Sequence, residues 1–328
     1  MTALGCLIER GIVLLRQRQA DRCTLAGQRG VLRLASAECF SEVGDNTRLM
    51  KSSALRPQPH QATTGQSMCD SEADLVVSVI SHGHAAMVQR LLHQMAQGGV
   101  GPLRRVVLTL NLPEPEPAPP ATGWPFVLDI RRNQHPQGFG ANHNAALEGA
   151  TEAFVCVLNP DVELLGDAFA ALVAVASHNA GDGGFTLSYP VQVDALGHVQ
   201  GSERALPSPG ALFLRRALGR VETRVDWVNA ACMVLPLAAW RQVRGFDESY
   251  HMYCEDVDLC LRLRLAGGRL VRAPVRVLHV GERASNRNWR HLWWHVSSLL
   301  RLWRSPVYRR ARHLVTVAGA DARTIAGS

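Results

Sequence analysis

The sequence predicts an α/β protein with a mainly parallel sheet flanked by helices. From Asp74 onward, short β-branched runs alternate with stretches of helical pattern, which is typical of parallel strands joined by helices. Three of the first four predicted strands end in polar residues, and such sheets bind ligands at the carboxyl ends of their strands. These polar ends are Ser81 with His82, Asn111, and Asn159 with Asp161. The pattern therefore predicts a binding site along one edge of the sheet.

The elements of the first half are defined by their apolar pattern and by the turn formers between them. Runs rich in Val, Ile and Leu predict the strands, and the Pro-rich stretch 113–120 ends the second of them. The predicted strands cover residues 74–81, 103–111, 125–131 and 152–159. The predicted helices run from after the first strand to about Gln97, from 140 to 149 and from 166 to 178.

The second half has a more mixed pattern. Residues 225–236 are predicted as a strand leading into a short helix, and residues 256–266 as a helix closed by Gly267 and Gly268. Residues 269–280 are predicted as a strand. Pro274 favours an edge position for that strand, because proline lacks the N–H group that an interior ladder needs.

The first 72 residues have no sustained periodicity and end in a polar stretch, 51–70, rich in Ser, Gln, Thr and Pro. We interpret them as a mostly disordered extension, and Met68 as an alternative start of the protein. The predicted organisation is therefore an extension over 1–72, a catalytic domain over 73–282 and a basic, Trp-rich helical segment over 283–328.

Composition describes an ordinary soluble protein, with 47% apolar residues and a mean hydropathy of −0.03. No apolar run approaches the roughly 20 residues that a membrane span needs, and Glu9 and Arg10 interrupt the first apolar stretch, so it is a poor signal peptide. The eight cysteines show neither a C-x-x-C pair nor zinc spacing, which fits a reducing cytosol. The net charge of +7 indicates an anionic partner.

The densest acidic cluster of the ordered chain is Glu255, Asp256 and Asp258, at the start of the predicted helix 256–266. One carboxylate at a helix N-terminus is favoured by the free N–H groups and the helix dipole. Three within four residues repel one another, which points to a cation site or to a carboxylate poised as a base. The alternative interpretation is a solvated helix start.

Two further groups carry weaker signals. Asn159-Pro160-Asp161 is either a tight turn or, through Asp161, a site for a divalent cation on a diphosphate. His279 ends a predicted strand, where a histidine is structural or a ligand. In the segment 133–147, Gly138 and Gly140 would let backbone approach a phosphate or sugar, although the G-x-G-x-x-G pattern fails at His143.

In their order along the chain, these motifs resemble those of family 2 glycosyltransferases, in the rhamnosyltransferase-like branch. The resemblance covers about Leu75 to Trp303. The matching segments are VVSVISHGH, NQHPQGFGANHNAAL, VLNPDVEL, WVNAACMVL, GFDESYHMYCEDVDLCLRLRLAG and LHVGE. The resemblance implies a fold of the GT-A type and an inverting transfer of a sugar.

The resemblance also assigns roles to individual residues. Asp256, with Glu255 beside it, matches the catalytic base. Asp161 and His279 match residues that hold Mg²⁺ or Mn²⁺ on the donor diphosphate, with Asn159 in place of a first aspartate. The residues implied to bind the nucleotide-sugar are Ser81, His82, Asn111, Asn133, Gly138 and Asn159. Those implied to contact the sugar or the acceptor are Trp227, Asn229 and Asp258.

The implied reaction is a single displacement in which an acceptor hydroxyl attacks the anomeric carbon of a nucleoside-diphosphate sugar. The branch favours deoxythymidine-diphospho-rhamnose as donor, with uridine-diphospho-sugars second, and a saccharide or polyprenyl-linked acceptor in surface polysaccharide synthesis. Two asparagines, Asn111 and Asn159, stand where the family commonly has aspartates, and they leave open a second interpretation as a non-catalytic nucleotide-sugar-binding relic.

Residues 283–312 contain eight arginines, no acid and four of the seven tryptophans. An apolar stripe at helical spacing runs through Trp289, Trp293, Val296, Leu300 and Trp303. Two interpretations are open and compatible with each other: a terminal helix packed on the catalytic domain, and an interfacial helix on anionic lipid. The second predicts a cytoplasmic protein peripheral to the membrane. Nucleic acid is not expected as a partner, because the basic residues gather in one segment without a recognisable motif.

Overall fold

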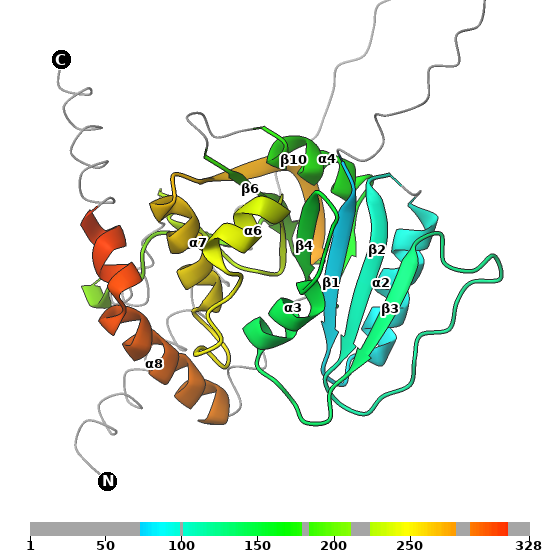
Figure 1. Ribbon diagram of the computed structural model, residues 1–328, viewed down its shortest axis with the longest axis horizontal. Helices are drawn as coiled ribbons and strands as arrows, with labels where there is room; N and C mark the ends of the chain where they lie inside the picture. Colours follow the sequence, from blue (N-terminus) through cyan, green and yellow to red (C-terminus); the bar gives the residue numbers. More distant parts are fainter. Residues whose placement is uncertain (1–72, 99–100, 179–183, 211–223, 280–288, 314–328) are drawn as a thin grey trace, which may run out of the picture. The chain divides into compact units, whose positions relative to one another are not determined.

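The computed structural model describes residues 73–98, 101–178, 184–210, 224–279 and 289–313 (Figure 1). All of them belong to one compact unit, Gly65–Ser328. The predicted extension 1–72 lies outside the described residues.

The core of this unit is an eight-stranded sheet with the order β3-β2-β1-β4-β9-β6-β10-β5 (Figure 1). Strands β3, β2, β1 and β4 are all parallel, which confirms the predicted α/β architecture for the first half. Their bounds are Leu75–Ser81 for β1, Leu103–Leu110 for β2, Val127–Arg132 for β3 and Phe154–Leu158 for β4. Strands β1 and β4 are buried almost throughout, because neighbouring layers cover both of their faces.

The other half of the sheet mixes directions. Strand β9 is antiparallel to both β4 and β6, β10 is parallel to β6, and the short β5 is antiparallel to β10. These strands span Val162–Leu164 (β5), Thr186–Val193 (β6), Cys232–Pro236 (β9) and Arg269–His279 (β10). The sequence pattern predicted neither β5 nor β6.

Helices cover the sheet on both sides. Apolar residues of α2 and α4 pack with Leu75, Val77 and Val79 on one face of the sheet. Those of α3, α6 and α7 pack with Val76, Val155 and Val157 on the opposite face. The alternation of β1 between the two clusters follows from the two-residue period of a strand. The helices span Ala85–Gln97 (α2), Phe139–Leu147 (α3), Ala168–Ala176 (α4), Leu237–Val243 (α6) and Glu255–Leu265 (α7).

Two predictions about the second half are wrong in detail. Residues 225–236 are not one strand: β8 (Trp227–Val228) pairs with β7 (Glu203–Arg204) in a separate ribbon, and a turn at 229–231 leads into β9. Strand β10 lies inside the sheet and not at its edge. The ladder with β6 is irregular between Arg272 and Arg276, so Pro274, which has no N–H group to donate, falls in a stretch without paired residues. Strand β5 pairs only with Val277–His279, beyond this stretch.

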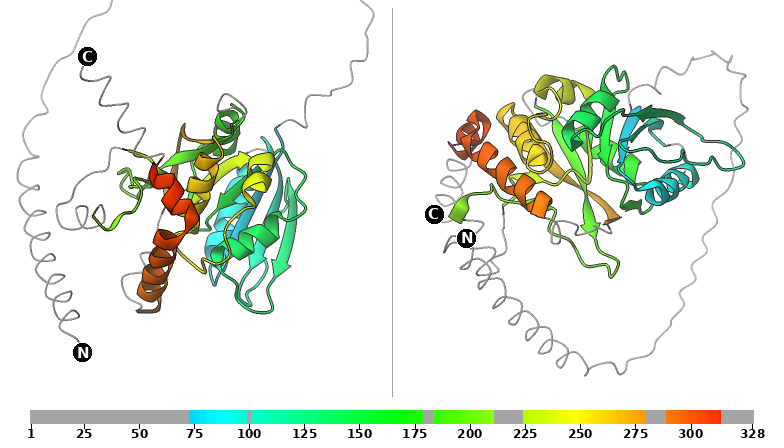
Figure 2. Two further views of the ribbon diagram at one scale, coloured as in Figure 1. Left: turned by 60° about the vertical axis from the view of Figure 1, so that its left-hand side comes forward. Right: turned by 90° about the horizontal axis from the view of Figure 1, so that it is seen from below.

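The predicted C-terminal amphipathic helix is present as α8, Trp289–Arg304. A third apolar cluster joins it to α7 and to the helical segment 306–313, through buried side chains that include Val257, Leu261, Leu302 and Tyr308. Figures 1 and 2 show α8 beside α7, on the side of the unit away from β3. Among the described residues, none of the helices has both the length and the apolar character required to cross a membrane.

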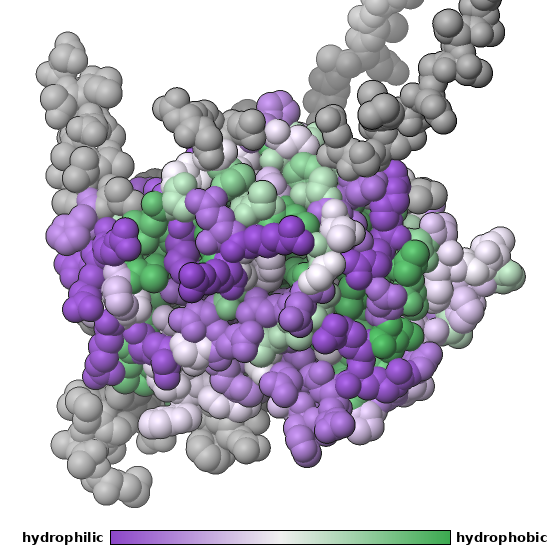
Figure 3. Space-filling model, in the orientation of Figure 1, coloured by the Kyte–Doolittle hydropathy of each residue, from purple (hydrophilic) through white to green (hydrophobic). Residues whose placement is uncertain are grey.

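The face drawn in Figure 3 is mostly hydrophilic, and apolar side chains gather most clearly over the edge strand β3. Val127 at the start of β3 is 58% exposed. An edge strand has a free row of backbone donors and acceptors, and the charged Arg131 and Arg132 at its other end limit pairing with a second chain.

Candidate active site

Asp161 and His279 lie in contact although 118 positions separate them in the chain. Asp161 follows β4, at its carboxyl end, and His279 ends β10, whose last three residues pair with β5 directly after Asp161. Their side chains approach to 3.3 Å between Asp161 Oδ2 and His279 Nε2. The sequence analysis expected these two residues to meet, and the β5–β10 pairing places them together.

A polar chain continues from His279 to the turn before β9. His279 Nδ1 faces Gln192 Oε1 at 3.1 Å, and the amides of Gln192 and Asn229 bond reciprocally, at 2.5 and 3.0 Å. Gln200 Nε2 donates to the backbone carbonyl of His279 at 2.7 Å. The imidazole is therefore fixed from behind, and its Nε2 edge is directed toward Asp161.

One oxygen of Asp161, Oδ1, is buried without a hydrogen-bond partner in the described structure. Burial alone would raise the pKa of Asp161, but the hydrogen bond and charge of His279, with a smaller contribution from His84, bring it below its usual value. The carboxylate is therefore ionised at neutral pH and has one oxygen free to accept a ligand.

The acidic cluster begins α7 and follows a strained turn. Tyr253 and Cys254 have positive φ angles of 71° and 68°, which side-chain-bearing residues adopt at an energetic cost. This turn redirects the chain so that Glu255 and Asp256 form the first turn of α7. At the other end, the helix closes on Gly267 (φ 85°) with Gly268 N–H donating to the Leu263 carbonyl, as the predicted C-cap requires.

Both carboxyl groups at this helix start are shifted toward their protonated forms. Burial raises the pKa of Asp256 to about 6, against the opposing effects of the Val257 and Ala230 N–H groups and the charge of Arg204. Burial, followed by the charge of Asp256, raises the pKa of Glu255 well above its usual value. Glu255 is 6% exposed, and its Oε2 has no partner among the described residues.

The turn 229–231 contacts both acidic groups. Asn159, two positions before Asp161, donates its backbone N–H to the carbonyl of Ala231 at 2.8 Å. The N–H of Ala230 acts on the Asp256 carboxylate, and Asn229 holds Gln192 behind His279. Segments that are far apart in the sequence therefore meet at one three-residue turn.

A second polar network lies at the carboxyl ends of β1 and β2. Asn111 is buried, with 5% of the residue exposed. Its side-chain oxygen accepts from Asn133 Nδ2 at 2.7 Å and from the Gln137 N–H at 2.8 Å. Its own amide donates to the Gln137 carbonyl at 3.0 Å and lies 2.9 Å from His82 Nδ1. The amide of Asn111 therefore orders the loop 133–138, and Ser81, fully buried, accepts from the N–H of His84 at 3.2 Å.

Close packing explains why glycine is required at positions 138 and 140, which the sequence alone did not reveal. A Cβ atom on Gly138 would lie 2.7 Å from the carbonyl oxygen of His251, and one on Gly140 would lie 2.8 Å from Cβ of Phe246. Phe139 N–H also donates to the His251 carbonyl at 3.1 Å. Both glycines thus allow α3 to approach the loop 245–254, which leads into the acidic helix start.

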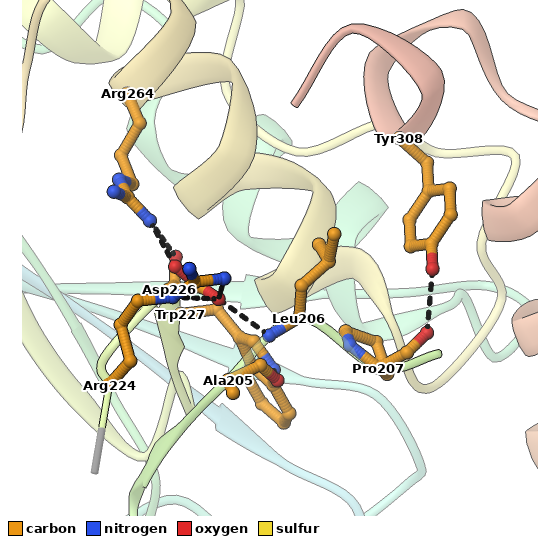
Figure 4. Close-up of polar contacts among 8 residues, drawn as sticks. All are labelled: Ala205, Leu206, Pro207, Arg224, Asp226, Trp227, Arg264 and Tyr308. Carbon is orange, nitrogen blue, oxygen red and sulfur yellow. Dashed lines mark hydrogen bonds and ion pairs between the residues drawn. The ribbon is translucent and has the colours of Figure 1, made fainter. Parts of the chain in front are cut away.

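Asp258 and Trp227, expected near the acceptor, make contacts inside the protein. Asp258 is 1% exposed and pairs with Arg262 at 2.6 Å, and Arg262 also binds the backbone carbonyls of Val243 and Gly245. The Trp227 indole N–H donates to the Ala205 carbonyl at 3.0 Å (Figure 4). Both side chains therefore have partners inside the protein, and contact of either residue with an acceptor stays a prediction.

Asp226 is a buried junction that the sequence analysis missed. Its carboxylate is fully buried and binds Arg264 at 2.8 Å, Arg224 at 2.8 Å and the N–H of Leu206 at 2.8 Å (Figure 4). It thereby ties β8 to α7. Its position directly before Trp227 gave no signal, because a single aspartate between apolar residues is also typical of a turn. Gln192 was missed because it is an isolated polar residue in β6, a strand that the sequence pattern did not predict.

The residues at Asp161 fit a divalent cation bound with a substrate. Mg²⁺ and Mn²⁺ prefer oxygen ligands, and Mg²⁺ commonly uses one or two carboxylates together with substrate phosphates and water. The unpartnered Asp161 Oδ1 and the oriented His279 Nε2 provide two adjacent donors. Among the described residues, no three or more His, Cys, Asp or Glu side chains are arranged so that they could hold a metal ion together, so the remaining ligands would come from the substrate and solvent.

The larger cavities do not lie at Asp161, where the described residues enclose only about 30 Å³. One of about 620 Å³ lies between α3 and the 240–248 segment, and another of about 580 Å³ lies between α8 and the 247–251 loop. The two cavities therefore flank the loop 245–254 on its way to Glu255 and Asp256.

The chain belongs to the glycosyltransferase-like family 2, whose model matches residues 73–302. It is 29% identical over 185 residues to rhamnosyltransferase WbbL of Escherichia coli (strain K12), which covers 50% of this chain and 69% of WbbL. It is 32% identical over 154 residues to the N-acetylglucosaminyl-diphospho-decaprenol L-rhamnosyltransferase of Mycobacterium tuberculosis, which covers 41% of this chain and 49% of that protein.

The pre-mycofactocin glycosyltransferase of Mycobacterium tuberculosis is 29% identical over 230 residues, covering 67% of this chain and 45% of the relative. The chain thus spans 69% of WbbL but about half of the two mycobacterial proteins. Among solved structures, the mannosyltransferase PcManGT from Pyrobaculum calidifontis, in complex with GDP-Man and Mn²⁺, matches at 16% identity with a TM-score of 0.46. That match covers 77% of this chain and 79% of PcManGT.

Proposed function

We propose that this protein is an inverting, metal-dependent glycosyltransferase that moves a sugar, rhamnose first among the candidates, from a nucleoside-diphosphate donor to a saccharide on a polyprenyl carrier. The family membership supports glycosyl transfer. The names of two relatives support rhamnose, and one of those names specifies a diphospho-decaprenol acceptor. The observation that carries the mechanism is the meeting of the Asp161–His279 pair and the Asp256 helix start at the turn 229–231.

In the proposed reaction, the acceptor hydroxyl oxygen forms a bond to the anomeric carbon while the bond from that carbon to the diphosphate oxygen breaks. The hydroxyl proton passes to Asp256, and the bond electrons leave with the nucleoside diphosphate. A base with a pKa of about 6 is ionised at neutral pH and still accepts a proton more readily than an ordinary aspartate. Burial and the charge of Asp256 raise the pKa of the neighbouring Glu255, so the two carboxyl groups titrate as a pair.

Asp161 and His279 would hold the divalent cation, which stabilises negative charge on the departing diphosphate when it is bound. The protein contributes the orientation of both ligands. Gln192 accepts from His279 Nδ1, which leaves Nε2 for the metal, and the Asn159–Ala231 hydrogen bond fixes the loop that carries Asp161. The Asn111 network, together with Ser81, His82 and Gly138, supports the loops beside which the nucleotide would lie.

A donor screen tests this function. Release of nucleoside diphosphate would be measured with deoxythymidine-diphospho-rhamnose and uridine-diphospho-sugars, each with Mg²⁺ or Mn²⁺ and then with EDTA. We expect acceptor-dependent release with one donor, abolished by EDTA. An α-configured donor must give the β-configured product, or the reverse, if the transfer is inverting. Retention of configuration would exclude the single displacement.

A non-catalytic nucleotide-sugar binder is the second candidate. It is favoured by Asn111, whose side chain is occupied by internal contacts, and by Asn159 in place of an acidic metal ligand. The same screen separates the two functions. Tight donor binding without turnover on any saccharide acceptor would support the binder and contradict the enzyme.

We also propose cytoplasmic residence with peripheral contact to the membrane through α8. Four apolar residues of α8 are 40–65% exposed: Leu292, Trp293, Val296 and Leu300. Exposed Arg301, Arg304, Arg309 and Arg310 follow them in the chain. An apolar stripe next to cationic side chains fits the interface of a bilayer that contains anionic lipid.

A further inference from the structure

Helix α8 divides its contacts between two faces. Its inner face holds the loop that precedes the acidic helix start: Ser298 donates to the Met252 carbonyl at 2.9 Å, and the Trp294 and His251 rings lie 5.0 Å apart. Its outer face exposes Leu292, Val296 and Leu300, at intervals of four residues. One helix therefore joins an apolar surface to the loop of the candidate active site.

A cavity of about 580 Å³ opens between this helix and the loop 247–251. Its walls include Trp294, Arg301 and Arg304 from α8, His251 from the loop, and Ser305 at the start of the helical segment 306–313. Rows of residues four positions apart connect it to the apolar face. Leu292, Val296 and Leu300 lead to Arg304, and Trp293 leads through Ser297 to Arg301.

The cavity walls favour an anion. Within the described part of the chain, neither Arg301 nor Arg304 forms an ion pair. The charge of Arg301 reaches the cavity wall, because it opposes the rise in the pKa of Tyr250 that burial causes. Ser305 accepts from the N–H of Tyr308 at 3.0 Å and begins a helix there, which adds the positive end of a helix dipole. Asp247 is the acidic group in the wall, and its Oδ1 accepts the N–H of Ser249 at 2.9 Å.

We propose that this cavity binds the diphosphate of a polyprenyl-linked acceptor, with its prenyl chain along the exposed apolar face of α8. The inference rests on the proposed function. Arg301 and Arg304 would bind the phosphates, and Trp294 and His251 would contact the first sugar. His251 precedes Asp256 by five residues, so their Cα atoms lie no more than about 18 Å apart. The first sugar and the diphosphate of the acceptor would together span part of this distance between the cavity and the proposed base.

The combination of charge and apolar surface decides the ligand class. A nucleoside diphosphate would use the arginines but leave the apolar row without a partner, and a neutral lipid would leave both arginines without one. A prenyl diphosphate satisfies both, because its charged and apolar parts are joined in the same order as on α8. The prenyl chain would remove the exposed apolar surface of Leu292, Val296 and Leu300 from water, which favours binding.

Direct binding tests this assignment without requiring catalysis. Three probes would be titrated into the full-length protein: a short-chain prenyl diphosphate, the matching prenyl alcohol and inorganic diphosphate. We expect the prenyl diphosphate to bind at least tenfold more tightly than either fragment. The double variant Arg301→Ala/Arg304→Ala should weaken its binding at least tenfold. The matched control, Arg269→Ala/Arg276→Ala, removes the same charge from exposed positions on β10 that do not line the cavity, and it should leave binding within twofold.

Equal effects of the two double variants would overturn the cavity assignment and indicate general attraction to anions. Equal affinity for inorganic diphosphate would overturn the role of the apolar face. Arg301→Lys/Arg304→Lys keeps the charge and should restore part of the affinity. Thermal unfolding of each variant checks folding.

A kinetic experiment separates this inference from the proposed function. Transfer would be compared on a prenyl-diphospho-saccharide and on an alkyl glycoside of the same saccharide. Arg301→Ala/Arg304→Ala should raise the acceptor KM at least tenfold on the first and less than twofold on the second, with kcat retained. Loss of transfer to both acceptors would contradict a diphosphate site. Absence of transfer by the unchanged protein would contradict the proposed function, while the binding titration would still decide the cavity.

Discussion

Asp256 combines a raised pKa with a place in the first turn of a helix, where N–H groups support its charged form. Burial has the larger effect and sets the pKa at about 6. The carboxylate also accepts the Val257 N–H at 2.8 Å, which fixes its orientation. An oriented carboxylate with this pKa has the properties of a general base.

Replacement of Asp256 by Asn removes the base but retains the oxygen that accepts the Val257 N–H. We therefore expect kcat for sugar transfer to fall by about 10²- to 10⁴-fold, the usual contribution of general base catalysis. Donor affinity should change less than threefold. Transfer assays and titration calorimetry measure the two effects, and wild-type turnover by Asp256→Asn would exclude this residue as the base.

The rate of transfer should depend on pH through the same group. The base must be deprotonated, so kcat/KM should fall tenfold per pH unit below about 6 and level off above it. The apparent value belongs to the Glu255–Asp256 pair. A pH–rate profile measured at constant ionic strength checks this, and a profile that is flat from pH 5 to 8 would contradict it.

At the metal site, Asp161→Ala removes the carboxylate and its unpartnered oxygen. We expect donor affinity in the presence of Mg²⁺ to fall by at least tenfold, while the weaker affinity in EDTA changes little. Titration calorimetry with and without metal gives both values. Gln200→Ala is the comparison variant. The Gln200 side chain donates to the backbone carbonyl of His279, so this change loosens the support of His279 but removes no metal ligand, and we expect a smaller loss of donor affinity. An equal loss in the two metal conditions would indicate that Asp161 has a structural role.

At the residue scale, the sequence motifs found the groups with reactive chemistry but not the groups that orient them. Asp161, Asp256 and His279 stood out because they follow strands or begin a helix. Gln192 gave no such signal, and Asn229 was named as a sugar or acceptor contact and not as a partner of Gln192. The two meet because β6 and the turn 229–231 are adjacent in space. The glycines of the 133–147 segment were identified, but their packing against Phe246 and His251 required the folded structure.

At the scale of elements, α8 and the loop 250–254 behave as one unit. Tyr253 stacks on His295 with ring centroids 4.8 Å apart and its hydroxyl lies 3.0 Å from His291 Nδ1. These contacts stabilise the left-handed backbone of Tyr253, which lies two residues before Glu255. The helix thus packs on the catalytic unit and also exposes an apolar stripe. The two interpretations of this segment in the sequence analysis, a packed helix and an interfacial helix, are therefore compatible.

The stripe itself differs from the predicted one in a single described member. Trp303 faces inward, where its indole N–H donates to the Pro207 carbonyl at 2.7 Å. Leu292, which was not part of the predicted stripe, is 61% exposed and belongs to the outer face instead. Helical spacing alone does not distinguish these faces, because a stripe predicted from period 3.6 spans more than a quarter of the circumference.

Membrane contact is predicted to depend on this outer face. Trp293→Glu with Val296→Glu should reduce flotation with liposomes that contain anionic lipid, because it places charge where apolar surface would enter the interface. The matched control is Leu196→Glu, at a residue that is 80% exposed elsewhere on the unit. Equal flotation of both variants and the unchanged protein would rule out α8 as the contact.

For the whole molecule, the buried acidic pair predicts a pH dependence of stability. The folded-state pKa of Asp256, about 6, lies above the ordinary aspartate value, so the folded state holds this proton more tightly than the unfolded chain. The corresponding stabilisation is complete below about pH 4 and is lost as the pH rises through 6. The ionised Asp256 carboxylate therefore weakens the fold at the pH where a catalytic base is active.

Asp256→Asn should consequently raise the free energy of unfolding by about 1–3 kcal/mol at pH 7.5, with little change at pH 4.5. Thermal unfolding at both pH values, for the variant and the unchanged protein, measures the difference. A lower Tm of the variant at pH 7.5 would show that the hydrogen bonds of the carboxylate outweigh its burial.

By itself, the sequence determined the parallel half of the sheet, the capped helix α7, the amphipathic α8 and the reactive side chains, because local patterning and turn chemistry specify elements of this kind. Tertiary structure decided the direction and neighbours of β5, β6, β9 and β10, the packing of the glycines and the inner face of α8. Pairing between distant strands is set by which apolar faces fit together and not by local preference. That same long-range pairing brings His279 to Asp161, and no pattern within either segment encodes it.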